Sequence, residues 1–444
     1  ISLLDTFLHT FACTHSCISY SSTPNTGCPV LGVHIKKHLS YTFYRISIAL
    51  AVFLAFFLQT FLLVDGTNIF MAHFTAWKAT EVSLPITIGG YAAIVTTFLI
   101  GSWLIHHKGR GMMLALIVIS GLATIMLAFC ENSYPLYFIA IIINNITLGA
   151  LLVLMTAIIT NWFNSTRGRM LGFVTIGAPF STAVCVPVIQ RLLMAGVAFQ
   201  SIFLVFGLVI IVFGVISFLL VPYLPEDVGY HADNREHAAV QTDTGATHEW
   251  TLAKLVRCKE AWLIMLAFGL MMLVSNCVMP LLFPHFLDVG VSPDIVLNLM
   301  TISAIVGIPL SYFWGWLDDK IGTKKACYTL AVGFTLMSIG MVFAKSGNLV
   351  IVAMAVIGIA AVIGGSPNLN PSIIVNVFGA SEYLNVNRYL NIGQNILRLL
   401  ALVMMSAIRD LTGSYTPGYV VCVVLSLVAL LCFVGIRQRY SDAK

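Results

Sequence analysis

An arginine lies inside an apolar stretch of this sequence that is long enough to cross a lipid bilayer. Arg398 has about ten uncharged residues on either side, so its charge is too deep to reach water comfortably. Charges at this depth usually face a cavity, and a guanidinium offers a fork of N–H donors that fits a carboxylate. We expect Arg398 to bind an anion. The alternative is a structural arginine bonded to backbone carbonyls or to a polar neighbour.

Three amide side chains precede Arg398 in the same stretch. Asn391, Gln394 and Asn395 lie seven, four and three positions before it. Residues three or four positions apart share a helix face, so Asn391, Asn395 and Arg398 should line one cavity, and we predict that all four residues bind the substrate. Three more amides at membrane depth either join helices by hydrogen bonds or contact the ligand: Asn144, Asn145 and Asn276.

Two titratable residues are candidates for proton coupling or for an outer gate. Asp65 ends the first apolar stretch, where its carboxylate could take up a proton or could simply be a solvated helix end. His285 follows Phe283 and Pro284. It is either a gate or proton site, or an interfacial histidine near Asp288.

Membrane-spanning helices must position these residues. The 444 residues are 59% hydrophobic and 9% charged, whereas soluble domains carry about 25% charge. Apolar blocks approach the roughly 20 residues that cross a bilayer, and backbone groups in hydrocarbon must pair within their own segment. Six blocks, a polar break and six more blocks follow one another. We predict an all-α membrane protein with twelve transmembrane helices in two six-helix halves.

The predicted organisation has five parts. The Ser-, Thr- and His-rich start is expected to be disordered or to come from a mistaken start site, and the charged central break is typical of a linker. The parts are an N-terminal segment at 1–40, a six-helix bundle at 41–222, a cytoplasmic linker at 223–259, a second six-helix bundle at 260–437 and a cytoplasmic tail at 438–444.

Lysines and arginines are distributed unequally between the two predicted sides. Of 23 such residues, 18 fall on the side that holds both chain ends and the linker, four fall on the other side, and Arg398 lies inside a span. Cytoplasmic loops retain positive charge, so we predict both termini in the cytoplasm and the protein in a cytoplasmic or inner membrane. The net charge of +5 has the same origin, together with attraction to anionic lipid, and requires no nucleic-acid partner.

A short motif recurs in the two halves. The pattern Ile-Ile-x-Asn-x-Phe ends at Phe163 and again at Phe378, 215 positions later. The loop after the second predicted helix corresponds to the loop after the eighth at nearly the same offset. Internal duplication of this kind is typical of secondary transporters.

The loop after the eighth helix carries the pattern Gly-x3-Asp-Lys-x-Gly-x-Lys-Lys, which consists of Gly315, Asp319, Lys320, Gly322, Lys324 and Lys325. Glycines permit a sharp turn, and lysines face water and lipid phosphate. This pattern resembles the signature loop of the major facilitator superfamily, and the resemblance extends from about residue 40 to the C-terminus. It implies the major facilitator fold, and for this loop a role as a cytoplasmic gate rather than a substrate site.

The matching loop of the first half departs from the family pattern. We assign His106, Gly109 and Arg110 to the same cytoplasmic gate, but His106 and His107 stand where the family usually has an acid and a base. The loop therefore either responds to pH near the ordinary histidine pKa of about 6.5 or carries two surface histidines without such a role.

Two further stretches are similar to the oxalate/formate antiporter and monocarboxylate transporter group. They are Asn161–Phe163, after the fourth helix, and Pro225–Gly229, at the start of the linker. The resemblance implies a small organic anion of the monocarboxylate or dicarboxylate type, and a basic residue on the eleventh helix that contacts it, for which Arg398 is the match. The second basic residue expected on the eighth helix is absent from 294–317. This favours a monoanion, or a larger substrate held by apolar contacts.

Other classes of protein fit less well. The sequence has no GxSxG, HExxH or nucleotide-binding loop and no Cys/His spacing for a metal, so we expect no enzyme, cofactor or metal. We predict a monomeric secondary carrier whose partners are an organic anion, a proton or counter-anion, and the lipid bilayer. The alternatives are a non-transporting membrane sensor with the same fold and a carrier of a neutral or larger apolar solute. Coupling, direction and substrate identity are left open, although the Gly-Pro run at 172–179 loosely resembles a motif of antiporters.

Overall fold

Apolar helices of 18 to 33 residues build this molecule. The computed structural model describes residues 40–104, 109–163, 170–171, 173–174, 176–231, 250–344, 348–379 and 382–437. All of them lie in one unit, Leu39–Lys444. Within these ranges, 11 helices are long and apolar enough to cross a membrane, and a helix pair bent by 45° makes twelve if it counts as one span. The predicted all-helical membrane protein is therefore confirmed.

The first half begins where the side chain of Ser40 caps a helix by accepting a hydrogen bond from the Phe43 N–H at 3.3 Å. Its elements are α2 (Tyr41–Thr60), the π-helical turn η2 (Phe61–Asp65), α3 (Gly66–His73), α4 (Ala79–Leu104), α5 (Arg110–Leu127), α6 (Tyr134–Trp162), α8 (Gly177–Met194) and α9 (Phe199–Leu220).

The second half follows a short 3₁₀ turn, η3 (Pro225–Val228). Its elements are α10 (Leu252–Arg257), α11 (Lys259–Val278), the 3₁₀ turn η5 (Met279–Leu281), α12 (Leu282–Asp288), α13 (Pro293–Ile321), α14 (Thr323–Phe343), α15 (Leu349–Ile363), α16 (Gly365–Phe378), α17 (Tyr383–Thr412) and α18 (Thr416–Gly435). The bent pair is α13, which turns between Gly307 and Tyr312. Pro309 lies in this break, where it removes a backbone hydrogen bond.

The first span is longer than its apolar pattern suggests. Hydropathy predicts an end at Asp65, but the helical path continues through the π-helical turn and α3 to His73. Gly66, Thr67 and Asn68 remain helical and buried. Asp65 is therefore inside the span rather than at its end, and π-helical turns of this kind occur frequently at functional sites.

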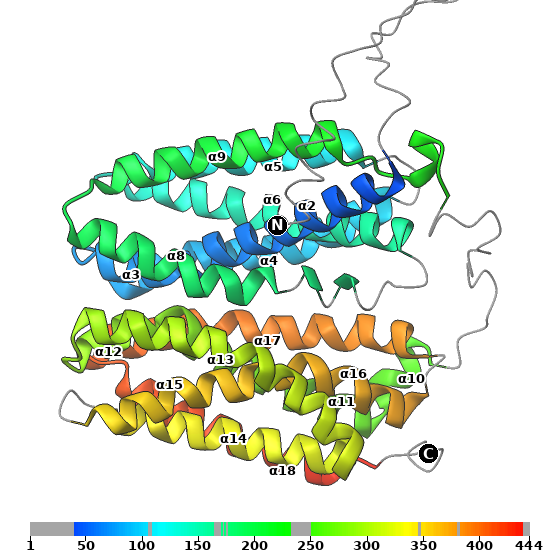
Figure 1. Ribbon diagram of the computed structural model, residues 1–444. Helices are drawn as coiled ribbons and strands as arrows, with labels where there is room; N and C mark the ends of the chain where they lie inside the picture. The colour runs from blue at the N-terminus through cyan, green and yellow to red at the C-terminus, as the bar shows by residue number, and fades with distance from the viewer. Residues whose placement is uncertain are drawn as a thin grey trace, which may run out of the picture. The chain divides into compact units, whose positions relative to one another are not determined.

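Two pairs of helices join the halves. Figure 1 shows α2 to α9 and α11 to α18 as two groups of helices, and the main contacts between them are α4 with α17 and α8 with α13. Helix α17 runs antiparallel to α4, since hydrogen bonds link Asp410 to Thr80 and Ile396 to Tyr91. The cavity described below lies beside this α4–α17 contact.

The repeated motif occupies matching positions in the two halves. Phe163 directly follows α6, and Phe378 is the last residue of α16. The Trp162 indole, next to Phe163, donates to the Pro222 carbonyl at 3.2 Å. The ring centroids of Phe378 and Trp250 lie 4.9 Å apart. In both halves the end of the motif thus packs against a residue at one edge of the central linker.

Candidate functional site

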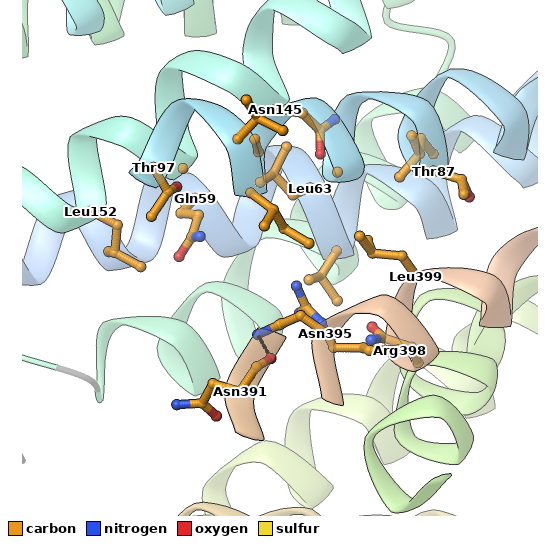
Figure 2. Close-up of a pocket in the computed structure, with 18 of the residues that line it drawn as sticks. Gln59, Leu63, Thr87, Thr97, Asn145, Leu152, Asn391, Asn395, Arg398 and Leu399 are labelled. Atoms are coloured by element: carbon orange, nitrogen blue, oxygen red, sulfur yellow. Dashed lines mark hydrogen bonds between the residues drawn. The ribbon is translucent and has the colours of Figure 1, made fainter. Parts of the chain in front are cut away.

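A cavity of about 810 Å³ lies between the two halves. The first half lines it with residues of α2, η2, α4 and α6, and the second half with residues of α11, η5 and α17. Figure 2 shows Asn391, Asn395 and Arg398 along α17, across from Gln59 and Asn145. This volume lies within the range of sites that hold small molecules.

One face of α17 supplies most of the polar groups of the second half. Arg388, Asn391, Asn395 and Arg398 all line the cavity, and their spacings of three, four and three place them on one helix face. The Asn395 amide nitrogen donates to the Asn391 carbonyl at 2.8 Å, which orients the Asn395 side chain (Figure 2). Three of the four predicted substrate-binding residues are thus brought together in the cavity.

The fourth predicted residue, Gln394, lies on another face of α17. Its side chain is fully buried and exchanges two amide hydrogen bonds with Asn370 of α16, at 3.1 and 3.3 Å. This reciprocal pair satisfies both amides and joins α16 to α17. Gln394 is not among the residues that line the cavity.

The charge of the cavity is positive. Among the residues the structure describes, the lining includes Arg388 and Arg398 but no Asp or Glu. Arg398 Nε is buried without a hydrogen-bond partner, and no ion pair of Arg398 occurs within the described ranges. Arg398 as a whole is half-buried. A partly buried cation without a counter-charge is costly, so a bound anion would offset this electrostatic cost.

Asp65 is fully buried between the first and fifth spans. Its two carboxyl oxygens accept hydrogen bonds from the Ser181 hydroxyl at 2.7 Å and the Thr182 hydroxyl at 2.9 Å. These donors replace water, which excludes a solvated helix end. No Lys, Arg or His of the described part of the chain forms an ion pair with Asp65. Its neighbours Leu63 and Val64 line the cavity, so the carboxyl lies next to the cavity wall.

His285 lies inside the second half. It is fully buried in α12, its Nε2 lies 3.1 Å from the Met341 carbonyl oxygen, and its ring centroid is 4.5 Å from that of Tyr419. Asp288, which the sequence placed near it, instead pairs with Arg409 at 3.0 Å. His285 is therefore neither interfacial nor part of the cavity lining.

The three other amides at membrane depth divide between the two roles considered for them. Asn144 is buried and accepts a hydrogen bond from the Ser120 hydroxyl at 2.7 Å, which joins α6 to α5. Asn145 and Asn276 line the cavity. One amide thus joins helices, and two are positioned to contact a ligand.

The basic residues that begin α5 and α14 make equivalent contacts in the two halves. Arg110 donates through Nε and Nη2 to the Phe218 carbonyl, at 3.0 and 2.7 Å. Lys324 donates to the Ile436 carbonyl at 2.7 Å. Each cation satisfies carbonyls at the end of the last helix of its own half, where the helix dipole favours positive charge.

The remaining residues of the predicted gate lie around the same turns. Gly109 caps α5, and Gly322 connects α13 to α14 with a φ of 85°, which favours glycine. Lys320 lies 4.6 Å from the ring centroid of Trp316. Gly315 and Asp319 belong to the last turns of α13, and Lys325 to the first turn of α14. His106 lies outside the described residues.

Hydrogen bonds between the halves gather at the end of the bundle that carries Ala79 and Asp410, which we call the closed end. The Asn68 amide donates to the Met279 carbonyl at 2.9 Å and accepts from the Phe283 N–H at 3.1 Å. Arg191 donates to Asn298 at 2.7 Å.

The opposite end, where α17 begins, is called the open end. Arg388 lies near this start of α17, is exposed and lines the cavity. The cavity therefore reaches the open end.

Sequence reasoning missed several lining residues. Gln59, Thr87, Thr97 and Thr156 line the cavity but are small or uncharged. A helical spacing links Thr87 to Thr97 through Gly90 and Ile94, and this pattern was a usable signal. Arg388 is among the 18 basic residues on the predicted cytoplasmic side, and its spacing of three from Asn391 also places it on the helix face of Arg398.

Comparisons with known proteins agree with this architecture. A family model described as Major Facilitator Superfamily matches residues 48–402 and 264–444. Monocarboxylate transporter 12 of Homo sapiens is 24% identical over 289 residues, which are 60% of this chain and 55% of that protein. The Arabinose-proton symporter of Escherichia coli (strain K12) is 35% identical over 95 residues, 21% of this chain and 20% of that protein. The chain thus matches about half the length of the former relative and a fifth of the latter.

Solved structures of low sequence identity share the fold. A bacterial homolog to the human lysosomal transporter Spinster, in an inward-facing and occupied conformation, has a TM-score of 0.69 at 12% identity, covering 88% of this chain and 96% of that one. A D-xylose-proton symporter has a TM-score of 0.68 at 15% identity, covering 90% and 99%. The 11 or 12 candidate spans of the described residues, the cavity between the two halves and the family model, which matches most of the chain, together show that the chain belongs to the Major Facilitator Superfamily.

Proposed function

We propose that this protein carries a small organic anion across a membrane by alternating access, and that Arg398 binds the carboxylate of that anion. The charge of the cavity carries the proposal, since its described lining holds two arginines and no acidic residue. Within the described part of the chain Arg398 forms no ion pair, so a carboxylate would supply a counter-charge. The partial similarity to monocarboxylate transporter 12 supports the same substrate class.

A single carboxylate fits the cavity better than two adjacent ones. Arg388 and Arg398 are ten residues apart on α17, which places their backbones about 15 Å apart along the helix. The uncharged amides Asn391 and Asn395 lie between them. A small anion would therefore contact one arginine at a time, with the amides and apolar residues such as Leu399 around the rest of the molecule. These features favour a monocarboxylate over a compact dicarboxylate.

The basic residues support a proposed orientation of the bundle. The open end carries the start of α17 and the Arg110 and Lys324 turns, and positive charge is retained in the cytoplasm. The open end would then face the cytoplasm, with both termini on that side and the closed end outside. Cysteines placed at exposed Leu411 and at exposed Arg257 test this in intact cells. An impermeant maleimide should label position 411 and spare position 257, and the reverse pattern would refute the orientation.

Asp65 is the proposed site of coupling. A carboxyl buried without a cation costs less free energy when it is protonated, and Ser181 and Thr182 supply two hydrogen bonds that would stabilise the ionised form. Burial therefore favours the neutral carboxyl, and the two hydrogen bonds favour the ionised one, so both protonation states are accessible next to the cavity. Asp65→Asn should abolish uptake driven by a pH gradient while leaving exchange of the anion intact. Equal gradient-driven uptake in the variant would exclude Asp65, and the same assay on His285→Gln tests the second coupling candidate.

Thermal stabilisation of the purified protein tests the anion proposal. Formate, oxalate, lactate and larger aromatic acids are compared on wild type, Arg398→Gln and Arg257→Gln. Arg257 is an exposed arginine on α10 outside the cavity, which makes it a matched control for loss of one positive charge. At least one acid should raise the Tm of wild type and of Arg257→Gln but not of Arg398→Gln. An equal rise in all three proteins, or none in any, would remove the organic anion as substrate.

A neutral polar solute is the second candidate. The cavity also carries the amides Gln59, Asn145, Asn276, Asn391 and Asn395, which suit hydroxyl groups, and the similarity to the Arabinose-proton symporter favours the same class. Xylose and arabinose in the same thermal assay distinguish the two candidates. A sugar that stabilises wild type and Arg398→Gln equally, with no response to acids, would favour the neutral solute.

A further inference from the structure

We propose that Arg388 forms a second anion site at the open end of the cavity, where the substrate carboxylate binds before it moves on to Arg398. This inference rests on the proposed function for the identity of the anion. The site itself follows from the position of Arg388, which lines the cavity and is also exposed to solvent.

The helix places Arg388 at the start of a continuous polar row. Arg388, Asn391, Asn395 and Arg398 recur at three, four and three positions, so each lies about one turn, or roughly 5 Å, beyond the previous one. The two arginines hold the ends of the row and the two amides fill the middle. A carboxylate leaving Arg388 would thus find hydrogen-bond donors at each turn on its way to Arg398.

Neighbouring residues hold the Arg388 guanidinium in place. Its Nη2 donates to the Tyr389 hydroxyl at 2.9 Å and to Asn385 Oδ1 at 3.4 Å, and its centre lies 4.8 Å from the Tyr389 ring centroid. Asn385 is buried and is itself fixed by a 2.7 Å hydrogen bond to the Trp250 carbonyl. Asn385 also donates to the Glu382 carboxylate at 3.4 Å. The two direct partners of Arg388 are uncharged and orient the cation, and no ion pair of Arg388 occurs within the described ranges.

A purely topological role does not explain this arrangement. A charge that only marks the cytoplasmic side needs solvent and lipid phosphate, as for Arg257 on the exposed side of α10. Arg388 instead forms part of the cavity wall and forms no ion pair within the described ranges. A positive group at the mouth of a cavity raises the local concentration of anions and their rate of entry.

The two arginines hold separate positions along α17. Their backbones are about 15 Å apart along the helix, and the Arg388 guanidinium is bonded to Asn385 and Tyr389 at the start of that helix, so we place the two sites in sequence. Arg388 would control capture from the open end, and Arg398 would control the bound state that crosses the membrane.

Charged thiol reagents test the mouth site without a known substrate. Ile392 lines the cavity one turn from Arg388 and is 45% exposed, so Ile392→Cys reports the local ion concentration. The anionic probe is 2-sulfonatoethyl methanethiosulfonate and the cationic probe is its trimethylammonium counterpart. Their reaction rates are measured in detergent at about 20 mM salt, where screening is weak, and the protein without Ile392→Cys supplies the background rate.

Adding Arg388→Gln should lower the anionic-to-cationic rate ratio about five- to tenfold, as expected for one charge within several ångström of the thiol. Arg388→Lys and the matched control Arg257→Gln should keep the ratio within about twofold of the parent. Arg388→Met replaces the glutamine variant if the latter does not fold. An unchanged ratio in the neutral variants, or an equal fall in Arg257→Gln, would overturn the mouth site.

The thiol-labelling experiment can fail or succeed independently of the thermal stabilisation experiment that tests the proposed function. The change in labelling ratio between the parent and the Arg388 variants reports on Arg388, because Arg398 is the same in both, whereas the loss of acid stabilisation in Arg398→Gln reports on Arg398. A lowered labelling ratio in Arg388→Gln together with no thermal stabilisation by any acid would mean that Arg388 concentrates anions at the cavity entrance of a carrier for another solute. Stabilisation by an acid together with an unchanged ratio would leave Arg398 as the binding residue and remove Arg388.

Discussion

Asp410 on α17 caps the first turn of α4 through Thr80. Its carboxyl oxygens accept from the Thr80 hydroxyl at 2.6 Å, from the Thr80 N–H at 3.0 Å and from the Ala79 N–H at 3.0 Å. A carboxylate at a helix N-terminus satisfies unpaired N–H groups and complements the helix dipole. Because α4 and α17 belong to different halves, this cap holds the closed end together, and opening that end must break it.

Asp410→Ala is therefore expected to favour opening of the closed end. Asp410 is exposed, so we expect a loss of roughly 1 kcal/mol, about a fivefold shift in the ratio of closed to open forms. Spin labels at the exposed positions Ala76 and Leu411 measure the change after reactive native cysteines are replaced. A longer-distance population should appear in Asp410→Ala and be smaller in Asp410→Asn, which keeps one acceptor. Identical distance distributions in all proteins would show that the cap does not control closure.

Asn68 of the first half forms hydrogen bonds with two backbone groups that are left unpaired where the seventh span, in the second half, is interrupted. In a regular helix the Phe283 N–H would donate to the Met279 carbonyl, but Pro280 interrupts the helix there. The Asn68 amide accepts from the former and donates to the latter. Asn68→Leu would leave two buried backbone groups unpaired and should lower stability by about 2 kcal/mol.

Thermal unfolding in detergent checks this effect. Thr67→Val is the matched control, because the Thr67 hydroxyl donates only within its own helix, to the Leu63 carbonyl at 3.3 Å. We expect a clear fall in Tm for Asn68→Leu and a small one for Thr67→Val. Equal falls would mean that the contact between the halves contributes nothing beyond local helix stability.

The sequence was sufficient to predict the fold and the inner end of the site. Twelve apolar blocks have few structural solutions in a bilayer, and an arginine at membrane depth is too costly to be incidental. Type and spacing alone therefore predict that Arg398, Asn391 and Asn395 line one cavity, which is where the structure places them. Arg388 was missed because a charge near the end of a span has a sufficient explanation in membrane topology, so its place on the same helix face was overlooked.

Contacts between distant segments were not predictable. Asp65 coincides with a drop in hydropathy, which predicts the end of the span at this residue. Its partner Ser181 is 116 positions away, and no periodic pattern connects the two. The contacts of Asn68 were not predictable either, because they depend on the helix break at Pro280 in the other half. Hydrogen bonds of this kind depend on packing between helices, which apolar periodicity does not encode.

Gly177 permits the close contact between α8 and α2. A Cβ at this position would lie 2.4 Å from the Phe53 carbonyl oxygen and 3.1 Å from the Phe57 nitrogen, and backbone atoms cannot move aside cheaply. Gly177→Ala should therefore destabilise the protein by about 1 to 3 kcal/mol. Gly101→Ala is the control, since that position in α4 has open space and alanine favours the helix. A Tm for Gly177→Ala equal to or above that of Gly101→Ala would contradict this packing.

Cys130, in the turn between α5 and α6, should resist thiol reagents. It is fully buried, and burial raises the pKa of its thiol to about 12. An ordinary thiol loses its proton near pH 8.5, so the folded protein retains a proton on Cys130 that the unfolded chain loses, and this contribution to stability declines as the pH rises towards 12. Maleimide labelling followed by mass spectrometry at pH 7 and pH 9 should find Cys130 unmodified in the folded protein and modified in denaturant. Rapid labelling of the folded protein at pH 7 would contradict the burial.

Uptake of radiolabelled lactate into proteoliposomes, with unlabelled acids as competitors, tests the central claim most directly. It also separates a carrier from a sensor, because a sensor binds without turnover. We predict saturable uptake by wild type and by Arg257→Gln, at least a tenfold loss of kcat/KM in Arg398→Gln, as expected for one lost charge-assisted contact, and partial recovery in Arg398→Lys. If wild type shows no saturable lactate uptake that unlabelled acids inhibit, or if Arg398→Gln transports as well as wild type, the assignment of an anion carrier acting through Arg398 is contradicted.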